Sequence, residues 1–279
     1  EHLELTPFVD NEQWLAASSA EIYTDHHAAY PITVPLLQFW MTSAVGYWNE
    51  SLMNLPWVLC YVALGAAFYG QARETGASVV SSAVFTYFLM SMPLLGTHVA
   101  LAGYADLFLG ACFCLAIMAF HNWAQRRQSW QAVLAVFFAI ACALIKNEGL
   151  FWLLTFVPAT LVVLYPGKKP LLALCAAAVI GVIGLLLVPR DLVVAGHSLE
   201  TLRIFFRPQA VRPVFESFFV YDSWHLLPYI LTGLLGASAL FNRPVFVELR
   251  GAMTALGSAL LLFLFLFLFT AYSGGAIRL

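Results

Sequence analysis

Three short polar clusters interrupt an otherwise apolar sequence, and their side chains are of the kinds that bind phosphate, sugar or metal ions. They are residues 26–31 (HHAAYP), residues 103–106 (GYAD) and residues 146–149 (KNEG). A carboxylate within apolar sequence is energetically unfavourable unless it lies at a membrane surface or faces a polar cavity. We therefore expect the three clusters at such a surface, where they would form most of a reaction site.

Asp106 is the candidate for catalysis or for binding a metal ion. It lies at the start of a predicted helix, where the helix dipole stabilises a negative charge. The structural alternative is that Asp106 only caps this helix. Tyr104, two residues earlier, is placed to orient Asp106 or a bound sugar.

Lys146, Asn147 and Glu148 put a cation, an amide and a carboxylate at one helix boundary. One interpretation is structural: Lys146 extends toward the membrane surface and pairs locally with Glu148. The other is a clamp for a lipid phosphate or a sugar, because lysine binds phosphate as a point charge. Gly149 then allows the chain to turn back into the membrane.

His26 and His27 follow Asp25 in the most polar part of the chain. Histidines in a polar loop are usually only solvated, but a pair beside a carboxylate is also suited to bind a divalent ion or a phosphate. Tyr30 precedes Pro31, which restricts Tyr30 to an extended conformation. We therefore expect Tyr30 to start a juxtamembrane helix at a fixed angle.

The composition is that of an integral membrane protein. Of the 279 residues, 62% are hydrophobic and 10% are charged, and the mean hydropathy is +0.84. Soluble domains have about 45–50% apolar and about 25% charged residues. Long apolar runs without two-residue alternation favour helices over an outer-membrane barrel. The net charge of −2 indicates no particular partner.

Five cysteines lie inside the apolar runs, which predicts buried thiols rather than a metal site. They are Cys60, Cys112, Cys114, Cys142 and Cys175. The motifs of soluble nucleotide-binding and hydrolytic enzymes are absent from the sequence, and nothing in it suggests nucleic acid.

The apolar runs predict an all-α fold, a polytopic transmembrane helix bundle with about eight spans plus juxtamembrane helices. Each span approaches the roughly 20 residues that a bilayer requires. The expected spans are residues 51–71, 77–97, 106–120, 130–145, 150–164, 171–188, 224–241 and 251–272.

We divide the chain into two parts. Residues 1–50 are expected to form an extracytoplasmic loop with a short helix at 11–22, followed by a juxtamembrane helix at 30–48; a true span at 30–48 is the alternative. Residues 51–279 are expected to form the bundle, with a long extracytoplasmic loop at about 189–223. The chain begins at Glu1, and we expect a fragment of a protein with at least one further helix upstream.

Basic residues in alternate short loops predict the orientation. The loops that carry them all fall on one side of the predicted bundle, which the positive-inside rule makes cytoplasmic. The residues are Arg73, Arg126, Arg127, Lys168, Lys169, Arg243 and Arg250. The three polar clusters and the long loop then share the opposite, extracytoplasmic side.

The long loop carries Arg203, Arg207 and Arg212 at helix-like spacing, interleaved with phenylalanines. Such a segment at a membrane surface is typical of an amphipathic helix that contacts anionic lipid headgroups. These arginines are also candidates for binding a substrate phosphate.

The order of these clusters resembles the GT-C superfamily of polytopic glycosyltransferases, which use polyprenyl-phosphate sugars as donors. The resemblance is greatest to bacterial members related to protein O-mannosyltransferases and lipid A aminoarabinose transferases. It rests on residues 27–37 (HAAYPITVPLL), 103–107 (GYADL) and 146–150 (KNEGL), and it covers about residues 10–165.

The resemblance implies a glycosyltransferase in the bacterial inner membrane, with its site facing the periplasm or the cell exterior. A lipid, glycan or protein would be the acceptor. His26, His27, Tyr30, Tyr104, Lys146, Asn147, Glu148, Arg203 and Arg207 would contact the substrates. Asp106 would bind a divalent cation, which some relatives use and others do not, or position the acceptor.

The family's essential carboxylate lies in its first extracytoplasmic loop, soon after the first transmembrane helix. We expect its counterpart upstream of Glu1; Asp10 takes this role only if the loop is shorter than usual. Two other classes stay open. A multi-pass transporter or lipid flippase would place charged groups near the bilayer midplane, often in paired repeats. A structural membrane subunit is the third class.

Overall fold

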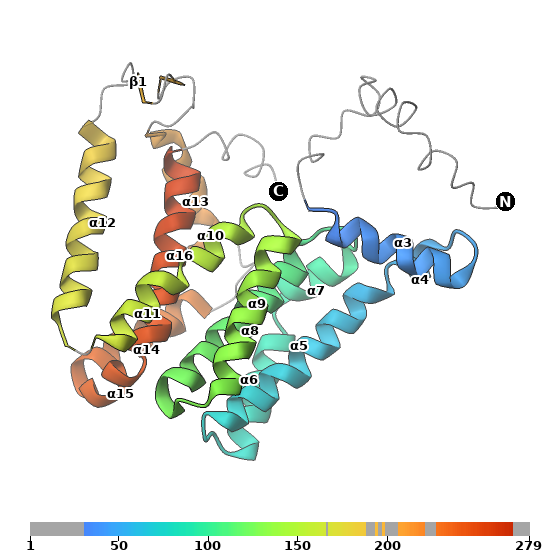
Figure 1. Ribbon diagram of the computed structural model, residues 1–279, viewed down its shortest axis with the longest axis horizontal. Coiled ribbons are helices and arrows are strands. Elements are labelled where there is room, and N and C mark those ends of the chain that lie inside the picture. The colour runs from blue at the N-terminus through green and yellow to red at the C-terminus, as the bar shows by residue number, and fades with distance from the viewer. Residues whose placement is uncertain are drawn as a thin grey trace.

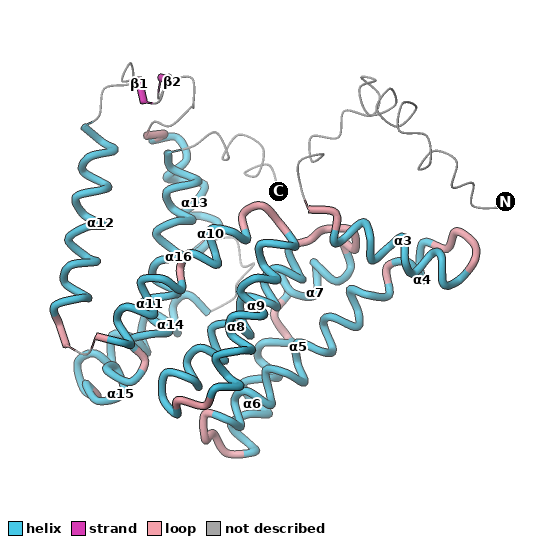
Figure 2. The backbone as a smooth tube through the Cα atoms, in the orientation of Figure 1, coloured by secondary structure: helices cyan, strands magenta, loops and turns pink. Residues whose placement is uncertain are grey.

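The computed structural model describes residues 31–165, 167–187, 193–194, 197–198, 206–220 and 227–269. These residues are helical apart from connecting turns and one antiparallel pair of two-residue strands, which confirms the all-α class (Figures 1 and 2). The elements are α3 Thr33–Val45, α4 Glu50–Met53, α5 Leu55–Glu74, α6 Val79–Met90, α7 Pro93–Ala100, α8 Asp106–Arg126, α9 Ser129–Ile145, α10 Gly149–Leu154, α11 Phe156–Leu164, α12 Lys169–Leu187, β1 Val193–Val194, β2 His197–Ser198, η2 Pro208–Ala210, α13 Val211–Phe219, α14 Leu227–Phe241, α15 Arg243–Glu248 and α16 Arg250–Phe269.

Three helical segments of the described chain are long and apolar enough to cross a membrane: Glu50–Glu74, Asp106–Arg126 and Arg250–Phe269. A fourth is added if α6 and α7, which are bent by 55°, count as one span. These segments agree with an integral membrane protein. The prediction of about eight spans is not supported.

Helix breaks and short helices explain the difference. Met92 is extended because Pro93 follows it, and this ends α6 before the apolar run is complete. The segments Ser129–Ile145, Gly149–Leu164 and Lys169–Gly184 are apolar but shorter than the roughly 20 residues that a bilayer requires. The apolar runs therefore predicted where helices form better than they predicted how many cross.

Helix α8 is the centre of the bundle. In the 18-residue apolar stretch of α8, 56% of the residues are buried inside the protein. The corresponding shares are 22% for Glu50–Glu74 and 17% for α16. It lies between α5 and α9 (Figure 1). On a further side, Phe120 packs edge-on against Phe156 of α11, with ring centroids 5.5 Å apart. The two ends of α8 are therefore the places where side chains from several helices meet.

At one end of the bundle, polar contacts join the loops that carry the basic residues. Arg126 pairs with Glu74 at 3.5 Å. Gln125 Nε2 donates to the carbonyl oxygen of Glu248 at 2.5 Å, and Arg127 Nη2 donates to that of Val163 at 3.4 Å. We call this end, formed by residues 73–78, 125–129, 163–165, 167–169 and 243–250, the basic end; it is the lower end in Figure 1.

The cysteine prediction is only partly right. All five cysteines are free thiols, but only Cys142 is buried. Cys60, Cys112 and Cys114 are half-buried, and Cys175 is exposed. Cys175 is exposed because it lies on α12 and lines an open groove between α12 and α16, which is described below.

Candidate functional site

Two of the three polar clusters meet at the end of the bundle opposite the basic end. Lys146 Nζ donates to Asp106 Oδ1 at 2.9 Å, although the two residues are 40 positions apart in the sequence. The Lys146 side chain is 17% exposed and that of Asp106 is 38% exposed. We call this end, formed by residues 101–106 and 146–149, the polar end. The pair is accessible from outside the bundle but is partly desolvated.

The antiparallel packing of α8 and α9 produces this contact. Asp106 is the first residue of α8, and Lys146 directly follows the last residue of α9. A negative charge at a helix start and a positive charge at a helix end both complement the helix dipoles. The same contact would therefore also serve as a clamp between two helix ends.

The structure does not support Asp106 as a helix cap. Ala105 occupies the N-cap position of α8, and no side chain accepts a capping hydrogen bond there. The Asp106 carboxylate instead reaches across to Lys146. Its hydrogen bond is with the residue that follows α9, and it does not accept a capping hydrogen bond from α8.

Trp57 fixes the turn that carries Asp106. Its indole N–H donates to the carbonyl oxygen of Tyr104 at 2.9 Å, and its ring packs edge-on against Phe108. Trp57 is fully buried. Gly103 adopts a φ of 111°, which side-chain-bearing residues rarely adopt. This arrangement leaves the Tyr104 side chain exposed beside Asp106.

Sequence reasoning missed Trp57. Its partner is a backbone carbonyl 47 residues away, so no local pattern indicates it. The available signal was a tryptophan directly after Pro56 at the start of an apolar run. We would expect its indole N–H to need a hydrogen-bond partner if the ring were buried.

Gly149 sets the path of the chain after Lys146. A Cβ placed on Gly149 would lie 1.7 Å from the carbonyl oxygen of Cys142, in the last turn of α9. The backbone N–H of Gly149 donates to the carbonyl oxygen of Lys146 at 2.8 Å. Glycine is thus required for close approach between α9 and α10. Asn147 is exposed and Glu148 is half-buried in this turn.

Helix α3 is attached beside the same end. Thr33 Oγ1 donates to the carbonyl oxygen of Leu144, two residues before Lys146, and Val34 is buried. With 13 residues α3 is too short to span a bilayer. This length is compatible with a juxtamembrane helix. Asp10, His26, His27 and Tyr30 precede α3 and lie outside the described residues, as does Arg203.

Arg207 lies beside the C-terminal end of α16. Its backbone N–H donates to the carbonyl oxygen of Leu268 in that helix at 2.7 Å. Arg212 lies in α13 and pairs with Glu216 at 2.7 Å. In the part of this segment that the structure describes, α13 begins at Val211 after the 3-10 turn Pro208–Ala210, so Arg207 lies outside the helix.

The described residues contain no group of three His, Cys, Asp or Glu side chains arranged to hold a metal ion. A divalent cation at Asp106 stays a prediction. No protein-family model, curated protein sequence or solved structure matches the chain.

Proposed function

We propose that the chain is part of a membrane glycosyltransferase that moves a sugar from a polyprenyl-phosphate donor to an acceptor. The observation that carries this proposal is the contact between Lys146 and Asp106. It joins two of the sequence motifs of the GT-C resemblance at the end of the bundle opposite the basic loops. By the positive-inside rule, that end faces away from the cytoplasm, which in a bacterium is the periplasm or the exterior.

In this proposal Lys146 binds the donor phosphate. The acceptor's hydroxyl oxygen forms a bond to the anomeric carbon, and the bond from that carbon to the phosphate oxygen breaks. The hydroxyl proton passes to a carboxylate, for which Asp10 is the candidate in this chain. Polyprenyl phosphate leaves with the electron pair, and the Lys146 ammonium stabilises the charge that develops on it.

Asp106 has two roles in this mechanism. It holds the Lys146 ammonium in place before the donor arrives, since the two side chains are already in contact. It also positions the acceptor or a divalent cation near Tyr104, whose side chain is exposed on the preceding turn. The transporter or flippase is less well supported, because Asp106 and Lys146 lie at helix ends and not in the middle of a span.

The first experiment measures binding of polyprenyl phosphate, because every donor of this class contains it whatever the sugar. We expect Lys146→Met to weaken binding to the purified protein by at least about tenfold while the melting temperature stays close to wild type. Glu74→Gln is the control, since it breaks a more exposed ion pair at the basic end. Equal binding by wild type and Lys146→Met would refute the phosphate assignment.

The second experiment measures sugar transfer from polyprenyl-phosphate mannose and polyprenyl-phosphate aminoarabinose by the protein in proteoliposomes. We expect Asp106→Asn to lower the rate by at least about 100-fold, the scale of losing one important electrostatic contact. If the pair is only a clamp between helix ends, Asp106→Asn would instead lower the melting temperature and leave transfer per folded molecule unchanged. Movement of polyprenyl phosphate across the bilayer without transfer would favour a flippase.

A further inference from the structure

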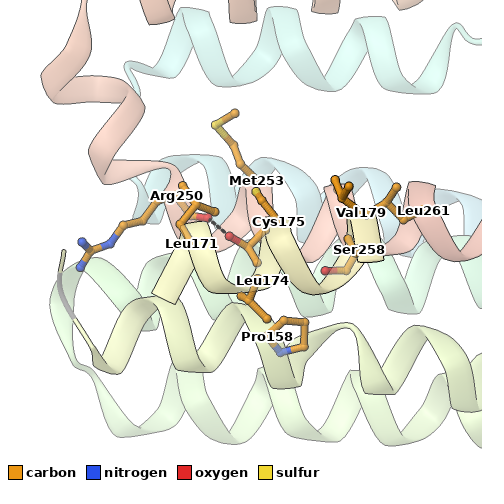
Figure 3. A pocket seen from close by; sticks show the side chains of 12 residues that line it. Pro158, Leu171, Leu174, Cys175, Val179, Arg250, Met253, Ser258 and Leu261 are labelled. Atoms are coloured by element: carbon orange, nitrogen blue, oxygen red, sulfur yellow. Dashed lines mark hydrogen bonds between the residues drawn. The ribbon is translucent and has the colours of Figure 1, made fainter. Parts of the chain in front are cut away.

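An open apolar groove of about 530 Å³ lies between α11, α12 and α16 (Figure 3). Its volume is in the range of sites that bind small molecules, about 300–1,000 Å³. Along α16 the lining residues recur every three or four positions from Arg250 to Leu261, so they form one stripe. A matching stripe on α12 runs from Leu171 to Val179.

The groove has the length of one membrane leaflet. Arg250 to Leu261 covers eleven residue steps of about 1.5 Å, or roughly 16 Å. Half of a bilayer's hydrocarbon core is about 15 Å thick. The groove starts at the first residue of α16, at the basic end, and its inner end therefore lies near the middle of the membrane.

Small side chains leave the groove unfilled. Gly257, Ser258, Thr254 and Cys175 line it where longer apolar side chains would close the space between α12 and α16. A Cβ on Gly257 would meet no atom within 4 Å. The hydroxyl of Thr254 is satisfied within its own helix by the carbonyl oxygen of Arg250, at 2.7 Å. The groove therefore offers an apolar surface without competing polar groups at that position.

Positive charge gathers at the mouth of the groove. Figure 3 shows the guanidinium of Arg250 pointing away from the apolar lining. Lys168 and Lys169 are exposed and lie three and two residues before Leu171 in the sequence. Among the described residues, none of these three cations forms an ion pair. Exposed Glu248 is the only acidic residue near Arg250 in sequence, so the mouth stays net positive.

We propose that this groove binds one anionic glycerophospholipid from the leaflet on the side of the basic loops. An acyl chain lies along α16 as far as Leu261, and the phosphate contacts Arg250 and the two lysines. This occupant fits both the depth and the charge, because a phospholipid has its anionic group one leaflet away from its chain ends. The proposal does not depend on the glycosyltransferase assignment, since the polar end and the mouth of the groove lie at opposite ends of the bundle.

Native mass spectrometry of the protein in non-ionic detergent tests the proposal, with phosphatidylglycerol and phosphatidylcholine of identical acyl chains as probes. We expect one tightly retained phosphatidylglycerol and weaker retention of phosphatidylcholine. Gly257→Leu fills the groove and should weaken phosphatidylglycerol binding by about tenfold or more, because the displaced acyl carbons lose their burial. Arg250→Gln should weaken it by about fivefold and reduce the preference for the anionic lipid.

Gly181→Leu is the matched control. Gly181 is exposed on α12 outside the groove, and a Cβ there also meets no atom within 4 Å. Both replacements put leucine on an exposed helical position, so general effects on folding and on surface lipid should be equal. Loss of lipid in both variants would indicate non-specific surface lipid and overturn the proposal. Retention in Gly257→Leu, equal binding of both lipids by wild type, or a protein dimer in place of the lipid-bound monomer would also overturn it.

Discussion

Gly149 passes so close to the last turn of α9 that a Cβ on it would overlap the carbonyl oxygen of Cys142, at 1.7 Å. This approach lets the chain re-enter the bundle within four residues of the end of α9, and it holds Lys146 at the position where it meets Asp106. The polar end therefore depends on a backbone contact as well as on its charged side chains.

Gly149→Ala should lower the stability of the protein by about 3 kcal/mol or more, because backbone atoms of α9 must move to admit the methyl group. Thermal unfolding in detergent measures the effect. Gly110→Ala in α8 is the control: a Cβ there meets nothing within 4 Å, and alanine favours the helix by about 1 kcal/mol. If Gly149→Ala melts at the wild-type temperature, the close approach to Cys142 does not exist in solution.

Trp57→Phe should destabilise the protein by about 1–3 kcal/mol, because the carbonyl of Tyr104 loses its donor inside the bundle. The same thermal measurement applies. Trp40→Phe provides the comparison, since Trp40 lies on α3 and is 63% exposed. The melting temperature of this variant should stay close to that of the wild type. Equal melting temperatures for the two variants would contradict the anchoring role of Trp57.

Two buried glutamines should respond in opposite ways to leucine. Both amide atoms of Gln131 are buried without a hydrogen-bond partner among the described residues, so Gln131→Leu should stabilise the protein by about 1–2 kcal/mol. Gln71 accepts a hydrogen bond from Asn122 at 2.7 Å, so Gln71→Leu should destabilise it by about as much. The free energies of unfolding of both variants test this prediction. A loss of stability in Gln131→Leu would mean that the Gln131 amide has a hydrogen-bond partner.

The shared side of the basic loops is tested by labelling single cysteines in intact cells with an impermeant reagent. Ser129→Cys and Lys168→Cys lie at the basic end, and both positions are exposed. Neither should react from outside, whereas Asn147→Cys at the polar end should. The background carries Cys175→Ala, because Cys175 is exposed. Outside labelling at residue 129 or 168 would reverse the proposed orientation.

The sequence predicted helices well where apolar runs end at basic loops, and it predicted that Asp106 and Lys146 would lie at one end of the bundle. Both follow from hydropathy and from counting alternate loops. The break at Thr155 was missed although Pro158 marks it: proline cannot donate to the carbonyl oxygen four residues earlier, here that of Leu154, and its ring clashes with that carbonyl. The direct contact of Asp106 with Lys146 also depends on how α8 and α9 pack, which no local pattern contains.

The bend between α6 and α7 has a consequence for bilayers of different thickness. A straight span adjusts to a thicker or thinner membrane by tilting along its whole length. Here Pro93 separates two short rods at 55°, and the carbonyls at the joint already have partners in Tyr61 and Ser91. We expect α7 to swing at this joint while α6 stays packed on α5, which distances between spin labels at residues 80 and 97 in short-chain and long-chain lipids would reveal. A change of angle at this joint would then match the length that α6 and α7 span to the thickness of the bilayer.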